Sequence, residues 1–202
     1  MRVSECVGCT QFPCSDVKHE SYIVPGLEVD QDKVAVVMIS EAAPVDPGDY
    51  FYAQGAPLYQ QTTVQAFKEA GIAVESIKDI LTMGVYLTTA VKCGKISYGI
   101  KAGTIEECSL ILEKELALFP AVKVFLLMGD VAIKAINYIA KRAGQGRAIP
   151  AGSTYKIRNQ EFYLQGKRAL PSYLQAGPSF FIEKSKRKMI AEDIATGLSL
   201  LE

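Results

Sequence analysis

The sequence contains a single histidine, His19, and no stretch of apolar residues that approaches the length of a bilayer. A membrane-spanning helix needs about 20 consecutive apolar residues, so we expect no segment that spans a membrane. The first residues, MRVSECVGC, also lack the apolar core of a secretory signal peptide. We therefore expect a cytoplasmic protein. Because disulfides are rare in that compartment, we expect the five cysteines to serve metal binding, catalysis or packing.

The composition is that of one globular domain. A chain of 202 residues has the length of an ordinary domain, and a hydrophobic share of 49% is enough to build a core. The chain shows no internal repeat and no low-complexity tract. We therefore predict one domain over residues 1–202, in which residues 1–32 form an irregular N-terminal segment.

The net charge is zero, but the charges are unevenly distributed. Residues 1–130 carry 10 Lys and Arg against 17 Asp and Glu, whereas residues 131–189 carry 12 against 2. A basic segment on a neutral protein is typical of a surface that contacts a phosphate backbone. A solvated basic surface without a partner gives the same pattern, so the charge distribution leaves both interpretations open.

Apolar runs alternate with helical patterns along the chain. The runs VAVVMIS (34–40), GVYLTTAV (84–91) and AVKVFLLMG (121–129) are typical of strands that are buried on both faces. We expect helices over 58–70, 103–119, 130–144 and 183–201, and short strands in YKIR, FYL and RALPSYL.

This alternation predicts an α/β fold with a parallel sheet that helices cover on both faces. Thr104 and Glu107 have the spacing of a capping box at the start of the helix expected over 103–119. Ligands of such sheets bind at the carboxyl ends of the strands. The loops after Ser40, Thr88 and Met128 are therefore the expected location of a site.

Three of the cysteines lie close together near the N-terminus. Cys6 and Cys9 have the Cys-x-x-Cys spacing common among metal ligands, and Cys14 follows them. A structural zinc site would usually supply a second such pair, but Cys93 and Cys108 are far apart in the sequence. Four scattered thiolates can also hold a four-iron, four-sulfur cluster, and free cysteine is common in cores. Spacing alone leaves these alternatives open.

The neighbours of the cysteines resemble the iron–sulfur members of the uracil-DNA glycosylase superfamily. In that group a Cys-x-x-Cys precedes the first strand, a Thr-Asn-x-x-Lys-Cys segment ends a later strand, and a last cysteine follows in a helix. This chain has Cys6-x-x-Cys9, then YLTTAVKC ending at Cys93, then EEC ending at Cys108. The segment MISEAAP is similar to a Gly-Glu-(Ala or Gly)-Pro-Gly loop of the family, and YFYA to its Pro-Phe-Val-Gly segment. The resemblance runs from residue 6 to about residue 200.

The resemblance implies a three-layer α/β/α sandwich with a central, mainly parallel four-stranded sheet. It also implies a [4Fe-4S] cluster whose ligands are Cys6, Cys9, Cys93 and Cys108. Such a cluster would order the N-terminal segment and tie it to the rest of the domain. This assignment gives Cys14 no role. Cys14 is also an alternative ligand in place of Cys6 or Cys9.

The resemblance further implies a pocket that holds a flipped base. Glu41 would position or activate water, with Asp46 and Asp49 as competing carboxylates in the same loop. Phe51 would stack on the base, although packing in the core is the alternative for a phenylalanine. The expected base-binding residues are Ala42, Ala43, Phe51, Thr89, Gly177 and Ser179.

Two positions depart from the pattern of the family. Thr89 stands where an asparagine would read uracil, and a hydroxyl lacks the paired geometry of an amide. The family's His-Pro-Ser motif matches Gly177-Pro178-Ser179, while another register places Leu174 at the histidine position. One lost oxyanion donor typically costs about 10²–10³ in rate, and backbone N–H groups of residues 177–180 would offset part of it. His19 would have to reach the site through space.

The loop before the last helix would enter DNA in the family. Basic side chains beside it would contact phosphates. Phe180 and Phe181 would fill the vacated stack as a wedge, or would pack the helix onto the sheet. The expected DNA-binding residues are Lys167, Arg168, Phe180, Lys184, Lys186 and Arg187.

Three functions follow as hypotheses. A DNA glycosylase that releases uracil or another damaged base would depend on Glu41. A catalytically inactive nucleic-acid or nucleotide-binding protein on the same scaffold would bind DNA in a salt-dependent way and release no base. A redox protein would show a reversible cluster couple tied to its activity. We expect the first, acting on single- or double-stranded DNA as a monomer.

Overall fold

The centre of the fold is a sheet built from the apolar runs of the sequence. The computed structural model describes residues 1–201, and its six strands lie in the order β1-β3-β2-β4-β6-β5. β3, β2, β4 and β6 run parallel to one another, whereas the short edge strands β1 and β5 are antiparallel to their neighbours. The strands are β1 Val17–Lys18, β2 Val36–Ala43, β3 Val85–Lys95, β4 Val124–Met128, β5 Phe162–Leu164 and β6 Lys167–Ser172.

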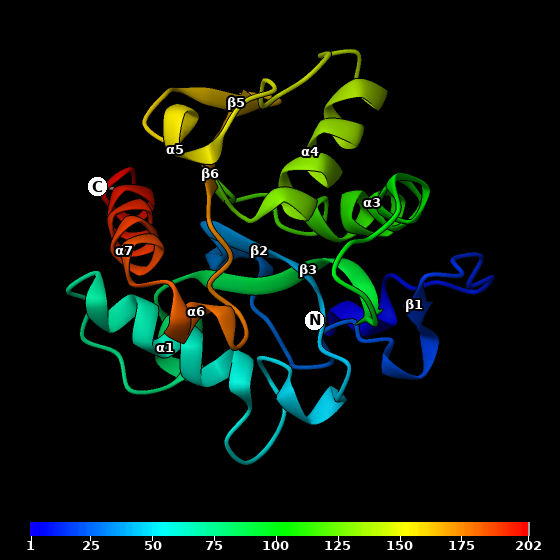
Figure 1. Ribbon diagram of the computed structural model, residues 1–202, viewed down its shortest axis with the longest axis horizontal. Helices are drawn as coiled ribbons and strands as arrows, with labels where there is room; N and C mark the ends of the chain where they lie inside the picture. Colours follow the sequence, from blue (N-terminus) through cyan, green and yellow to red (C-terminus); the bar gives the residue numbers. More distant parts are fainter. Residues whose placement is uncertain (202) are drawn as a thin grey trace.

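Helices cover both faces of this sheet (Figure 1). α3 and α4 pack together on one face, and α1 and α7 pack together on the other. Of the helices described, none is long and apolar enough to cross a membrane. The α-helices are α1 Leu58–Glu69, α2 Ile77–Thr82, α3 Ala102–Leu116, α4 Asp130–Arg142, α5 Thr154–Ile157, α6 Ser179–Ile182 and α7 Lys184–Ser199. The 3₁₀ turns are η1 Val3–Glu5, η2 His19–Ser21, η3 Gln31–Lys33 and η4 Pro47–Asp49.

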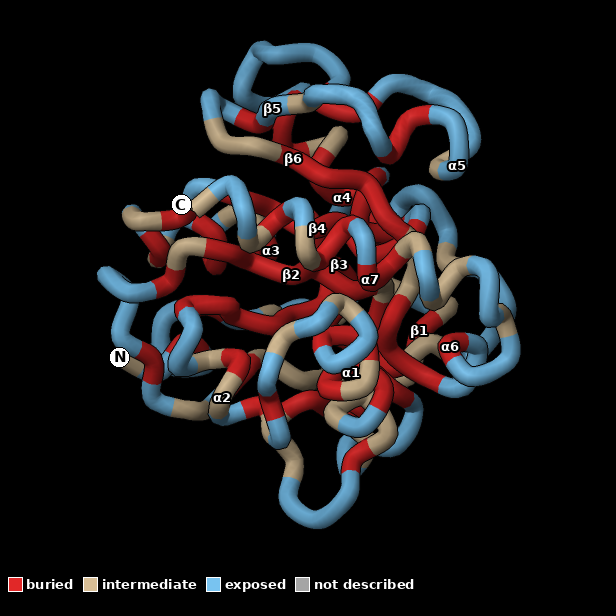
Figure 2. The backbone as a smooth tube through the Cα atoms, turned by 90° about the vertical axis from the view of Figure 1, so that its left-hand side faces the viewer, coloured by how far each residue is buried: buried red, intermediate tan, exposed pale blue. Residues whose placement is uncertain are grey.

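The continuous apolar runs fill two cores at once. Successive side chains of a strand point to opposite faces, so Val37 and Ile39 of β2 face α3 and α4, while Val36 and Met38 face α1 and α7. β4 alternates in the same way. In Figure 2, β2, β3 and β4 lie in the buried centre of the molecule. A strand that is buried on both sides has to be apolar throughout, which is why the runs are continuous.

The predicted fold class is confirmed. The four parallel strands form the predicted central sheet, and two short edge strands add to it. The prediction of a strand in YKIR is wrong, because residues Thr154–Ile157 form the short helix α5. α2 was not predicted, although Ser76 and Asp79 form the capping box that begins it.

The predicted capping box of α3 is also wrong. α3 begins after Lys101, so Thr104 already lies inside its first turn and Cys108 lies in the second. Asp16, from the N-terminal segment, takes over the capping role. Its carboxylate accepts hydrogen bonds from the backbone N–H of Lys101, at 2.7 Å, and from the Thr104 hydroxyl. A distant residue thus satisfies donors that a local cap would otherwise have to satisfy.

Candidate functional site

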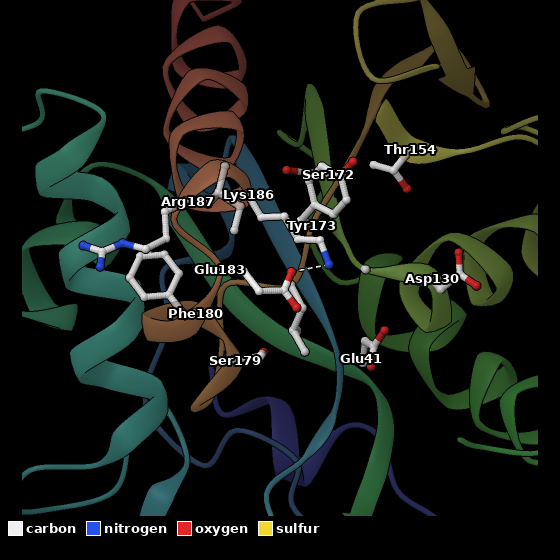
Figure 3. Close-up of a pocket in the computed structure, with 13 residues that line it drawn as sticks. Glu41, Asp130, Thr154, Ser172, Tyr173, Ser179, Phe180, Glu183, Lys186 and Arg187 are labelled. Atoms are coloured by element: carbon white, nitrogen blue, oxygen red, sulfur yellow. Dashed lines mark ion pairs between the residues drawn. The ribbon is translucent and has the colours of Figure 1, made fainter. Parts of the chain in front are cut away.

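The candidate site lies at the carboxyl edge of the sheet, between β2 and β4. The chain passes from β2 to β3 on one side of β2 and then crosses to β4 on the other side. Ligands of open α/β sheets bind in the crevice at such a switch point. A cavity of about 250 Å³ lies there (Figure 3). Its walls include Glu41 from β2, Gly129 and Asp130 after β4, and Ser172 at the end of β6.

Glu41 brings a carboxylate to this cavity. Its side chain is 15% exposed, and its Oε2 lies 3.3 Å from Nζ of Lys95. Gly129 makes room for it, since a Cβ at Gly129 would lie 2.7 Å from Oε1 of Glu41, and the φ of +100° there favours glycine. Gly129 also precedes α4, whose first N–H groups favour a negative charge nearby. The carboxylate is therefore held in place and still open to the cavity.

The two competing carboxylates of the same loop serve local structure. Oδ1 of Asp46 accepts a hydrogen bond from the backbone N–H of Gly48 at 2.9 Å. Oδ1 of Asp49 accepts one from the N–H of Leu58, at the start of α1, at 3.1 Å. Glu41 is the acid of this region that borders the cavity.

The opposite wall of the cavity comes from the region between β6 and α7. In Figure 3, Ser172, Tyr173, Glu183 and Lys186 line this side. Lys186 forms an ion pair with Glu183, and its Nζ lies 5.4 Å from the ring centroid of Tyr173. Sequence reasoning identified Lys186 but missed the other three residues. The end of the predicted strand RALPSYL was the available signal for Ser172 and Tyr173.

The expected base-binding residues fall into two groups. Ser179 borders the cavity beside Glu41. Ala42, Ala43, Phe51 and Thr89 are buried. A base could therefore reach the face of Phe51 only after a neighbouring side chain moves.

The loop at residues 177–180 offers one free backbone donor. The N–H of Gly177 bonds to Oγ1 of Thr62, and the N–H of Phe180 bonds to the carbonyl of Gly177. Proline has no N–H. Among residues 1–201, the N–H of Ser179 has no hydrogen-bond partner, and it begins α6. Of the four residues expected to replace the missing histidine, Ser179 is the one with a donor to give.

His19 does not replace the missing histidine in this structure. Its ring packs 5.3 Å from the ring of Phe12 in the N-terminal segment. The walls of the cavity, as far as the structure describes them, contain no imidazole. Gly177, with a φ of +102°, and Leu174 occupy the two positions that the motif could match.

Lys167 and Arg168 lie at the wrong end of β6 for the predicted role. Arg168 pairs with Val124 at the start of β4, and Ser172 at the other end borders the cavity. At about 3.3 Å per residue, the amino end of this strand is roughly 15 Å from its carboxyl end. The expectation that these two residues sit beside the loop that enters DNA is therefore wrong. Adjacency in sequence hid the direction of the strand.

The prediction that Phe180 is a DNA wedge also needs correction. Phe180 is 2% exposed and packs in the core under α7, whereas Phe181 is 47% exposed and Ile182 is 78% exposed. Arg187 lies over the Phe180 ring, 4.9 Å from its centroid, and pairs with Glu69 of α1. The Arg187 guanidinium is therefore already paired within the protein. Lys184, at the start of α7, is exposed and can contact a phosphate.

Four of the five cysteines gather at one place. Cys93 and Cys108 are buried in the core on the α3 side, and Cys9 and Cys14 pack against that core. Burial, together with the nearby charges of Cys108, Cys14 and Cys9, raises the pKa of Cys93 to about 12. Cys6 is exposed, and its Sγ lies 3.5 Å from the carbonyl oxygen of Arg2. The structure thus groups Cys14, rather than the predicted Cys6, with the other three.

The shape of this group bears on what it can hold. From Met1 to Leu201, no three His, Cys, Asp or Glu side chains lie close enough together to hold a metal ion. A four-iron cluster is wider than one ion and keeps its thiolates further apart. Tyr22 braces the group, because its hydroxyl accepts a hydrogen bond from the N–H of Cys9 at 2.8 Å. Thiols are the donors that iron–sulfur clusters take from proteins.

A buried ion pair joins β3 to α3. Nζ of Lys92 donates to Oγ1 of Thr88 at 2.8 Å and to the carbonyl of Thr89 at 2.7 Å, and it pairs with Glu115. The Tyr86 hydroxyl donates to Oε1 of Glu115 at 2.7 Å. Lys92 and Glu115 are both fully buried. Sequence reasoning missed this pair, although a lysine inside the apolar run before Cys93 was a signal for it.

Comparison with known proteins gives the family. A family model described as the uracil DNA glycosylase superfamily matches residues 28–192, which is most of the chain. A search of the curated proteins finds no match. The matched segment contains the parallel strands, Glu41 and the loop before α7. The chain belongs to the uracil DNA glycosylase superfamily.

Proposed function

We propose that this protein hydrolyses the N-glycosidic bond of a base flipped out of DNA. The observation that carries the proposal is the Glu41 carboxylate, held by Lys95 and by the space at Gly129, at a cavity in the switch point of the sheet. Membership of the superfamily supports a glycosylase-like activity. The proposed enzyme is active and releases uracil or another damaged base from single- or double-stranded DNA.

The chemistry needs a carboxylate more than any other group. The glycosidic bond breaks with its electron pair passing to the base, which leaves a sugar with oxocarbenium character. Glu41 would stabilise this positive charge and orient a water molecule toward the sugar carbon. The water oxygen forms the new bond to carbon, and its proton passes to the carboxylate or to solvent. The base leaves as an anion and takes up a proton from solvent, so the products are the free base and an abasic site.

The loop at residues 177–180 offers the departing base a backbone donor. The Ser179 N–H is free, and Ser179 borders the cavity with Glu41. One donor of this kind is typically worth about 10²–10³ in rate. A backbone donor in place of an imidazole stabilises the departing base less. We therefore expect a slower enzyme, or a substrate whose base is a good leaving group.

A second function has its own supporting observation. By the resemblance, the family's histidine position falls on Gly177 or Leu174 and its asparagine position on Thr89, and none of these has the corresponding chemistry. A binding protein that has lost hydrolysis would retain the fold and the cavity. It would bind DNA in a salt-dependent way and leave every base attached.

Base release decides between the two functions. Protein purified under anaerobic conditions is incubated with single- and double-stranded oligonucleotides that contain uracil, hypoxanthine, xanthine or normal bases only. Alkaline cleavage then reports abasic sites. We expect release from one class of damaged base. Salt-dependent binding without any abasic site would contradict the glycosylase and support the binding protein.

The DNA would approach the carboxyl edge of the sheet. Phe181 and Ile182 are exposed apolar side chains beside the cavity wall, and Lys184 follows them as an exposed cation. Tyr98, in the loop after β3, is fully exposed. Apolar side chains can fill a vacated base stack, and lysines can contact phosphates. We therefore assign the wedge to Phe181 in place of Phe180.

We further propose that Cys9, Cys14, Cys93 and Cys108 hold a [4Fe-4S] cluster. The proposal rests on the packing of these four side chains at one core and on the exposed position of Cys6. When bound, such a cluster supplies four metal–thiolate bonds that order a segment. Here it would tie the N-terminal segment to β3 and α3.

Two serine variants test this ligand assignment against the Cys-x-x-Cys alternative. In Cys14→Ser we expect most of the iron and sulfide per chain to be lost, together with the visible absorbance of the cluster. In Cys6→Ser we expect both to stay at the level of the unaltered protein. The measurement is iron and acid-labile sulfide on anaerobically purified protein. Full loading of Cys14→Ser together with an empty Cys6→Ser would contradict the assignment.

A further inference from the structure

The outer face of α4 borders a groove that the proposed glycosylase does not use. This groove, called here the α4 groove, has a volume of about 770 Å³, against about 250 Å³ for the cavity at Glu41. Binding pockets of proteins have volumes of roughly 300–1,000 Å³. The lining side chains of α4 are spaced three and four residues apart, so they form one stripe along the helix. They are Asp130, Ile133, Lys134, Asn137, Tyr138 and Lys141.

The opposite wall of the α4 groove is a loop that side-chain hydrogen bonds hold in place. The groove is lined there by residues from 146 to 152 and by α5. Asn137 donates to the carbonyl oxygen of Ile149 and accepts from the N–H of the same residue, both at 2.9 Å. Just before the wall, Oε1 of Gln145 accepts a hydrogen bond from the N–H of Gln165 at 2.8 Å. A wall fixed in this way does not have to be ordered when a partner binds.

The inner surface of the α4 groove is apolar. Ile133 of α4 and Ile157 of α5 reach it from opposite walls, and they are 8% and 7% exposed. The half-buried ring of Tyr138 and the exposed Pro150 extend this surface outward. Apolar side chains of a partner could therefore be removed from water here.

The rim of the α4 groove is basic. Lys134, Lys141 and Arg147 line it and are exposed. Lys134 pairs with Asp130 at 3.2 Å, whereas within residues 1–201 no carboxylate pairs with Lys141 or Arg147. Lys134 and Lys141 lie seven residues apart on α4, which is roughly 10 Å along the helix. The rim thus presents cations at both ends of this span and on the facing loop.

An acidic peptide with apolar side chains complements this groove. Carboxylates three residues apart in an extended peptide are also about 10 Å apart, so they match the spacing of the cations on α4. A nucleic-acid strand fits less well. Asp130 is 71% exposed and borders both the α4 groove and the cavity at Glu41, so phosphates that passed between the two would meet a carboxylate. Tyr138 is the aromatic residue of the lining, whereas strands of bases are bound by several stacking rings.

We propose that the α4 groove binds a partner protein through an acidic, apolar segment of that partner. The apolar side chains of the segment contact Ile133, Tyr138 and Ile157, and its carboxylates pair with Lys141 and Arg147. This function is separate from base release. It uses a different face of α4 from the one that packs on α3 and the sheet.

Binding of labelled peptides to the full chain, followed by fluorescence anisotropy, tests the proposal. The probe is the heptapeptide Glu-Asp-Leu-Glu-Asp-Phe-Leu. One control, Glu-Asp-Ser-Glu-Asp-Ser-Gly, keeps only the carboxylates, and the other, Gln-Asn-Leu-Gln-Asn-Phe-Leu, keeps only the apolar side chains. We expect the probe to bind saturably and at least about tenfold more tightly than either control. No binding of the probe, or equal binding of either control, would overturn the proposal.

Charge reversal at the rim shows whether the peptide binds in the α4 groove. Each exposed ion pair is worth up to about fivefold in affinity, so Lys141→Glu combined with Arg147→Glu should weaken probe binding by about tenfold or more. The matched control, Lys78→Glu combined with Lys123→Glu, makes the same change of charge at exposed positions outside the groove. Affinity should stay within about twofold there. Equal weakening by the two pairs of substitutions would contradict binding in the groove.

A milder pair of substitutions decides if the charge-reversed variant does not fold. Lys141→Gln combined with Arg147→Gln removes both charges without repulsion and should weaken probe binding roughly threefold or more. Unchanged affinity in this folded variant would overturn the proposal.

Two other occupants of the groove are separate outcomes. An oligothymidylate that binds more tightly than the probe, and loses its binding in the variant with both rim charges removed, would assign the groove to a nucleic-acid strand. A dimer of the unaltered protein that the same variant abolishes would assign it to a second copy of the chain. Either result would overturn the proposal. Because none of these measurements needs base release, this inference and the proposed glycosylase fail independently.

Discussion

Replacing Glu41 by glutamine should lower the rate of base release by about 10²–10⁴-fold, which is the usual contribution of a general base. Glutamine has nearly the same shape, so it can occupy the space beside Gly129. It carries no negative charge toward the sugar and cannot take a proton from water. The unfolding midpoint should stay within roughly 2 °C, because a half-buried isosteric change is mild. Initial rates on the preferred oligonucleotide give the comparison.

Asp46→Asn is the matched control for Glu41→Gln. Both changes remove one carboxylate charge, from Glu41 in β2 and from Asp46 in the loop that follows, but Asp46 serves the turn at Gly48 rather than the cavity. Asp46→Asn should keep nearly full activity. If Glu41→Gln retains activity while Asp46→Asn loses it, the carboxylate of the reaction is not Glu41.

Replacing Lys92 by methionine should lower the free energy of unfolding by about 3–5 kcal/mol, the usual cost of leaving one member of a buried ion pair alone. Methionine keeps the length of the side chain, so the change tests charge more than packing. Glu115 would keep its bonds from Tyr86 and Thr88 but lose its cation. Urea unfolding at neutral pH, followed by far-ultraviolet circular dichroism, gives the value.

The pair Lys68 and Glu75 provides the control for burial. Their side chains are 39% and 86% exposed, and exposed pairs contribute at most about 1 kcal/mol. Lys68→Met should therefore change stability little. The double variant Lys92→Met with Glu115→Leu should recover much of the loss, because apolar replacements of a buried pair are often neutral. Equal losses from Lys92→Met and Lys68→Met would refute the structural role of the buried pair.

The sequence is most informative where an interaction is local. The parallel strands could be predicted because each is a continuous apolar run, and a strand buried on both faces requires that pattern. The rule that sites lie at strand ends pointed to the region after Ser40, and the resemblance of MISEAAP to a family loop singled out Glu41 there, within the last residues of β2. The start of α3 could not be predicted, because the donors of Lys101 and Thr104 are satisfied by Asp16, 85 residues before Lys101.

The candidate site was harder to predict for the same reason. Spacing favoured Cys6 over Cys14, but packing against a core is decided by the path of the N-terminal segment across β3. Phe180 and Phe181 are neighbours in sequence, and only the phase of the turn decides which one is buried. The basic charges of residues 131–189 do not all lie at the cavity, because Arg158 is buried with Asp193 and Arg168 lies at the far end of β6. The periodicity of the sequence does not indicate which cysteines pack together, which phenylalanine is buried or where the basic side chains lie.

The arrangement of the sheet also protects the edge of its longest strand. β3 is a long strand, and its outer edge is covered by Val17 and Lys18 of β1 and by the N–H of Ile23, which bonds to the carbonyl of Lys92. The family match begins at residue 28, after all of these contacts. A chain shortened to that boundary would present the unpaired edge of β3, and exposed edges pair with one another. The N-terminal segment thus protects the edge of β3 against edge-to-edge association, whether or not a cluster is bound.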